Sequence, residues 1–160
     1  MAVPVYSWFV AVPVYSVKSQ GTRMIENREL KFIKVIFIVA ALWNLTGAVF
    51  GYFNTAYTFQ NFFGRELSDP LIYDIYKGAW GTTFVYFIGY LIVAYNPLKH
   101  TGIVIIGSIG KLGFALKLLQ FYMSGLANPV VLIVIIGDMI FMLLFFYYFY
   151  LLYKAEESIL

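Results

Sequence analysis

The sequence predicts an all-α integral membrane protein whose chain crosses the bilayer four times as a compact helical bundle. Hydrophobic residues make up 62% of the 160 residues and charged residues only 12%, whereas soluble domains carry about a quarter charged residues. The mean hydropathy of +0.81 points the same way. A spanning helix needs about 20 apolar residues, and four stretches of the chain are long enough.

These four stretches cover residues 35–57, 78–97, 101–123 and 129–153. The first two contain no charged residue, the third contains Lys111 and Lys117, and the fourth contains Asp138. A charge at the centre of a spanning helix costs about 2.5–3.5 kcal/mol on insertion scales. The Ile, Leu, Val and Phe residues around the charges offset that cost. Residues 35–160 are therefore predicted to form one transmembrane domain.

The segments between the stretches predict how the helices are connected. Residues 96–100 and 124–128 form short turns, which make the helices on either side of each turn antiparallel. Pro129 suits the first turn of a helix, where its missing N–H does no harm. The link 59–77 is longer, and Pro70 is a candidate start of a short interfacial helix within it.

Basic residues are distributed unevenly between the two sides of this topology. Seven lie on the side of the termini and two on the other side, namely Lys18, Arg23, Arg28, Lys31, Lys34, Lys99 and Lys154 against Arg65 and Lys77. Short loops rich in Lys and Arg stay on the cytoplasmic side. The sequence thus predicts a multi-pass membrane protein with both termini in the cytoplasm.

Residues 1–34 are predicted to form an N-terminal arm on the cytoplasmic side. Within it the sequence AVPVYS occurs at residues 2–7 and again at 11–16. The segment 1–16 is apolar, is too short to span a bilayer and lacks the basic start of a signal peptide. We interpret it as an interfacial or disordered arm. A packed or oligomer-forming arm is one alternative, and a segment foreign to the natural chain is another.

Small residues mark the faces along which the helices are expected to pack. Gly47 and Gly51 form a small-xxx-small pair, a motif that lets two helices approach closely in lipid. The pair serves either packing within the bundle or a seam with a homo-oligomeric or other membrane-protein partner. Membrane lipids are the expected partners of the remaining apolar faces.

Three polar residues are placed near the middle of the membrane, namely Asn44, Lys111 and Asp138. Counted from the turn near Leu126, the depth of Asp138 differs by about 4.5 Å from that of Lys111 and from that of Lys117, at ~1.5 Å rise per residue. Lys117 can instead extend its long stem toward the interface. We therefore predict that Lys111 pairs with Asp138, that Asn44 lies beside them, and that Lys117 is the alternative partner.

The candidate site is interpreted in two ways. Two buried opposite charges can simply fix helix packing, or they can form a proton-labile or ligand-binding site. The first interpretation suits a non-enzymatic subunit, assembly factor or scaffold. The second suits a carrier or binder of a proton, quinone or lipid. A scaffold predicts no cavity beside Lys111 and Asp138, whereas a binder predicts a pocket or water path that reaches them.

Other chemistry receives little support from the sequence. The chain has no cysteine and one histidine, His100, so we expect no metal site and no cofactor. No nucleophile–base pair and none of the P-loop, GxSxG or HExxH motifs occurs. An enzyme is therefore the third choice, no catalytic residue is assigned, and no nucleic-acid partner is expected for a net charge of only +3.

Overall fold

The fold is that of a computed structural model, in which residues 25–157 are described. The helices are α1 (Asn27–Ala48), which continues into the π-helical turn η1 (Val49–Phe53), then α2 (Thr55–Phe63), α3 (Pro70–Tyr95), α4 (Thr101–Met123) and α5 (Val131–Glu157). Four of these units are long and apolar enough to cross a membrane, namely 27–53, 70–95, 101–123 and 131–155. The predicted fold class is thus confirmed. The repeated AVPVYS segments lie outside the described residues.

The first spanning helix begins at Asn27, earlier than the predicted residue 35. Its first turn is held by the backbone N–H of Glu26, which donates to the carboxylate of Glu29 at 3.0 Å. Such reciprocal capping starts a helix in polar sequence, where hydropathy gives no signal. Residues 27–34, which the sequence assigned to the arm, therefore belong to α1. For the residues before 25, the arm remains a prediction.

The first span also ends earlier than predicted, at Phe53 instead of residue 57. Asn54 leaves helical geometry, and the chain then turns into the separate helix α2. Threonine hydroxyls satisfy carbonyl groups at this break, because Thr55 Oγ1 donates to Tyr52 O at 2.9 Å and Thr58 Oγ1 to Phe50 O at 2.8 Å. The bend thus leaves few backbone groups without a hydrogen bond.

Pro70 does start a helix, but the prediction of a short interfacial helix at this position is wrong. Asp69 is the N-cap, and its carboxylate accepts from the backbone N–H of Leu71 at 2.8 Å. From there α3 runs unbroken to Tyr95, because no further proline occurs before Pro97. The separate short helix of the 54–77 region is α2, which precedes Pro70.

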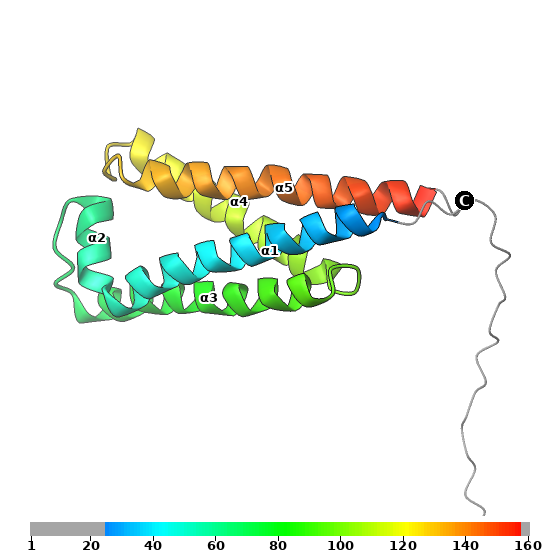
Figure 1. Ribbon diagram of the computed structural model, residues 1–160. Helices are drawn as coiled ribbons and strands as arrows, with labels where there is room; N and C mark the ends of the chain where they lie inside the picture. The colour runs from blue at the N-terminus through cyan, green and yellow to red at the C-terminus, as the bar shows by residue number, and fades with distance from the viewer. Residues whose placement is uncertain (1–24, 158–160) are drawn as a thin grey trace, which may run out of the picture.

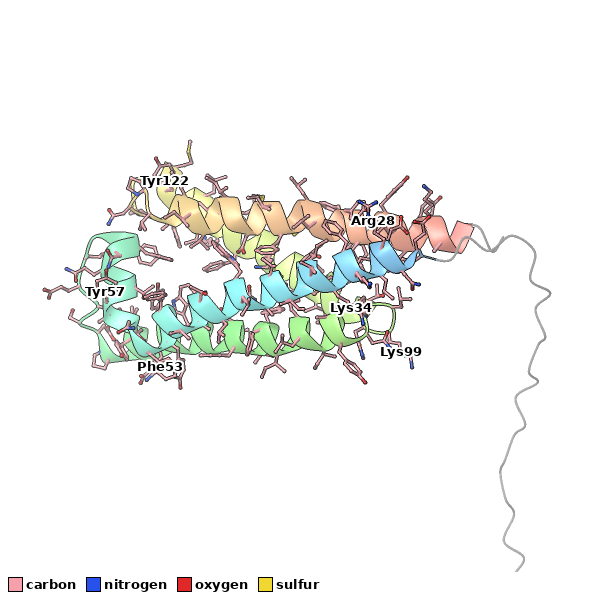
Figure 2. The ribbon with its side chains drawn as sticks, in the orientation of Figure 1. Arg28, Lys34, Phe53, Tyr57, Lys99 and Tyr122 are labelled. Atoms are coloured by element: carbon pink, nitrogen blue, oxygen red, sulfur yellow. The ribbon has the colours of Figure 1, made fainter. Side chains whose placement is uncertain are left out.

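The four long helices form two antiparallel pairs, α1 with α3 and α4 with α5 (Figure 1). Helix α2 stands across one end of the bundle, which we call the α2 end. The start of α1 lies at the opposite end with Arg28, Lys34 and Lys99 (Figure 2), which we call the basic end. The outward faces of the long helices carry exposed apolar side chains, as contact with lipid requires. They include Leu42, Val85, Ile109 and Leu143.

The glycine pair of α1 packs against α3. Gly51 is buried directly under the indole of Trp80, where a Cβ atom would overlap the ring. A Cβ on Gly47 would lie 3.2 Å from the same indole. The pair therefore serves packing within the bundle, which is one of its two predicted uses.

Candidate functional site

A buried ion pair joins α4 to α5 near the middle of the bundle. The Nζ atom of Lys111 lies 2.6 Å from Oδ1 of Asp138 and 2.9 Å from Oδ1 of Asn44. The three residues are only 7%, 4% and 6% exposed. We call them the polar triad. The structure confirms that Lys111 pairs with Asp138 and that Asn44 joins them.

Small residues accompany the polar triad on two helices. Gly107, Ser108 and Ala115 are buried on the face of α4 that carries Lys111. The hydroxyl of Ser108 donates to Val104 O at 2.7 Å, so it does not compete for the ion pair. On α1, Asn44 shares a buried face with alanines, which lets the helices approach and the long lysine side chain lie between them.

Trp43 is a fourth member of the site that the sequence did not reveal. Its indole Nε1 donates to Oδ1 of Asp138 at 3.1 Å. Gly137 makes this possible, since a Cβ there would overlap the Trp43 ring. An indole in an apolar helix usually packs as a hydrophobic group, so Trp43 gave no sign of a polar role by itself. The only signal in the sequence is that Trp43 is next to Asn44 and Gly137 is next to Asp138.

Lys117 does not reach Asp138. Its Nζ donates instead to Oε1 of Gln120 at 2.9 Å and lies 4.9 Å from the centroid of the Phe121 ring. The side chain is exposed. The alternative pairing with Asp138 is therefore excluded, and Lys117 takes a separate place at the site.

A cavity of about 780 Å³ reaches the polar triad from the α2 side. It lies between the α1–α3 pair and the α4–α5 pair, and α2 also contributes to its wall. Lys111, Asp138, Asn44 and Lys117 all line it. Aromatic rings make up much of the remaining wall, among them Trp43, Phe62, Trp80, Tyr86, Phe114 and Phe121.

Tight aromatic packing fills the bundle on the basic side of the triad. The ring centroid of Phe37 lies 5.2 Å from that of Phe145 and 5.3 Å from that of Tyr148. The hydroxyl of Tyr148 donates to Pro97 O at 2.7 Å, which ties α5 to the turn after α3. The cavity therefore ends close to the ion pair, at Gly107 one turn beyond Lys111, and its polar end lies near the middle of the bundle.

Helix α2 lines the opposite end of the cavity and is bonded there to the turn between α4 and α5. The backbone N–H of Asn128, in the turn between α4 and α5, donates to Phe62 O at 2.7 Å. Its side-chain amide donates to Asn61 O at 2.9 Å. These two bonds fasten the α4–α5 pair to the segment that follows α1.

No protein-family model matches this chain. Comparisons with curated proteins and with solved structures gave no match either. Among the described residues, no group of three or more His, Asp or Glu side chains could hold a metal ion.

The polar triad keeps hydrogen-bonding capacity for a ligand. Both bonds to Asp138 end on Oδ1, and no group in the described part of the chain bonds Oδ2. Lys111 uses two of its three N–H donors, and the Asn44 amide N–H groups have no acceptor among those residues. A ligand in the cavity would thus find both donors and an acceptor, on a site whose formal charges cancel.

Proposed function

We propose that the protein binds a lipophilic small molecule inside the membrane and holds a neutral polar group of that molecule at Lys111, Asp138 and Asn44. The observation that carries the proposal is the cavity of about 780 Å³ that reaches the buried ion pair. Ligand pockets measure about 300–1,000 Å³ and are mostly apolar with a few polar groups. A scaffold or assembly factor needs no such space beside a structural ion pair.

The geometry also favours a class of ligand. The triad is neutral overall and offers donors and an acceptor together, which suits a carbonyl or hydroxyl group. The aromatic wall suits a flat ring or an extended hydrocarbon. A quinone or a hydroxylated lipid has both parts, and both belong to the carrier or binder class, which the sequence offered as the alternative to a scaffold.

A contact quencher of tryptophan fluorescence tests this proposal, because Trp43 and Trp80 line the cavity. The probe is a brominated medium-chain alcohol added to the full chain in phosphatidylcholine nanodiscs. We expect quenching that saturates with probe concentration and is reversed by the unbrominated alcohol. Saturation is expected because a cavity has one or a few sites, whereas collision from the lipid does not saturate.

A matched pair of α3 variants provides the control. Thr83→Phe places a ring in the cavity, so the saturable quenching should disappear. Val85→Phe adds the same ring at a position that is 67% exposed and does not line the cavity, so quenching should persist. Quenching that rises linearly and equally in all three proteins would refute binding in the cavity.

We also propose that the basic end faces the cytoplasm, so that both termini are cytoplasmic. The seven-to-two distribution of basic residues supports this, and Arg28, Lys34 and Lys99 share one end of the bundle (Figure 2).

Reporter fusions at residues 68, 99, 126 and 160 measure this orientation. Fusions at 99 and 160 should report the cytoplasm, and fusions at 68 and 126 the opposite side. An external signal at 99 or 160 would contradict the proposed orientation.

A further inference from the structure

Lys117 is a cation on the cavity wall, and no carboxylate in the described part of the chain pairs with it. The charged residues of the lining are Lys111, Lys117 and Asp138, so their formal charges sum to +1. Lys111 is matched by Asp138 at 2.6 Å. The one hydrogen bond of Lys117 goes to the neutral amide of Gln120, and among the described side chains no carboxylate lies within 4.0 Å of it.

The position of Lys117 places this charge at the seam between α3 and α4. One turn earlier on α4, the Phe114 ring meets Trp80 of α3 at 6.0 Å between centroids. Two turns earlier, a Cβ on Gly110 would lie 2.8 Å from the hydroxyl oxygen of Tyr86 on α3. Lys117 follows them on the same side of α4. It stands six residues beyond Lys111, or about 9 Å nearer the α2 end at ~1.5 Å per residue.

A lysine without a counter-charge carries a cost in a membrane-spanning helix. Extending its stem to the interface reduces that cost but gives no reason for the side chain to line the cavity. An anion beside Lys117 would make the lining neutral overall. Because the cavity lining is mostly apolar and aromatic, attraction between the two charges would be stronger there than at a soluble surface.

On the basis of the proposed function, we infer that the bound molecule is an acidic amphiphile. Its neutral polar group lies at the triad, and its carboxylate or other acidic group lies against Lys117 near the seam of α3 and α4. The apolar body between the two groups occupies the ring-lined part of the cavity. The α3–α4 seam is then the side from which the acidic group contacts the protein.

A pair of probes of equal length tests the inference, namely a medium-chain ω-hydroxy fatty acid and the corresponding diol. Each displaces the brominated alcohol from the full chain in phosphatidylcholine nanodiscs at neutral pH. We expect the acid to bind about tenfold more tightly than the diol, the ratio that ~1.4 kcal/mol of interaction gives. Lys117→Gln should lower the affinity for the acid to that for the diol and leave the diol unchanged.

Two further variants separate charge from general effects. Lys117→Arg should retain the preference for the acid, because the positive charge is kept. Lys77→Gln removes a lysine that lies over the Tyr52 ring and does not line the cavity, so the preference should also persist.

Two negative results are distinguishable. Equal affinity of wild type for acid and diol, or a preference that survives Lys117→Gln, would overturn the acidic amphiphile and leave the proposed binding function intact. Failure of both compounds to displace the alcohol, together with quenching that never saturates, would overturn the acidic amphiphile and the proposed binding function alike.

Discussion

Replacing Asp138 with alanine is expected to lower the free energy of unfolding by about 3–5 kcal/mol, because it leaves a buried lysine without its counter-charge. Lys111 is 7% exposed and its Nζ would keep only the neutral oxygen of Asn44. Trp43 would lose its acceptor at the same time. Reversible unfolding in mixed detergent micelles, followed by circular dichroism, measures the loss.

Replacing both charged residues with apolar ones should recover much of this loss. The variant Lys111→Met with Asp138→Leu contains no buried charge, and buried ion pairs are often replaceable at little cost. The recovery should be incomplete, since Trp43 keeps an unpaired N–H, which costs about 1–3 kcal/mol when buried. Equal instability of the single and double variants would contradict this account of the pair.

The same double variant separates structural from functional use of the triad. If the pair only fixes the helices, the refolded double variant should still show saturable quenching by the brominated alcohol. The proposed function requires the opposite result, because the variant lacks the groups that hold the ligand. A folded protein that no longer binds the probe would therefore assign the pair to recognition.

The sequence was sufficient to predict the ion pair for a simple geometric reason. Lys111 and Asp138 flank a short turn, and regular helices rise by a constant distance per residue. Depth can then be counted outward from the turn without knowing how the side chains pack. The span of α4 was predicted with the bounds the structure shows, 101–123, because polar turns limit it on both sides.

The sequence could not predict the features that depend on packing among several helices. The break at Asn54 involves only two polar residues, Asn54 and Thr55, in an apolar run, so hydropathy does not detect it. Trp43 reaches Asp138 only because Gly137 leaves space on another helix. The cavity depends on the side-chain volumes of α1, α2, α3, α4 and α5 together. The periodicity of residues within one helix therefore does not predict it.

Gly51→Ala is expected to destabilise the bundle markedly, although it adds only one methyl group. A Cβ at this buried position would overlap the indole of Trp80. The indole has little freedom to move, because its ring lies 6.0 Å from Phe62 and 6.2 Å from Tyr76 between centroids. Overpacking of this kind costs about 1–3 kcal/mol, which the same unfolding measurement in mixed micelles would detect. Displacement of Trp80 should also weaken binding in the cavity that it lines.

Gly78→Ala on α3 is the matched control, since nothing lies within 4 Å of the added Cβ. It should leave stability unchanged or raise it by up to about 1 kcal/mol through helix propensity. In a Trp80→Phe background the cost of Gly51→Ala should fall, because the smaller ring gives space and the two sites are coupled. An undiminished cost in that background would exclude the indole as its source. A change of oligomeric state without loss of stability would instead favour the homo-oligomeric use of the Gly47–Gly51 pair.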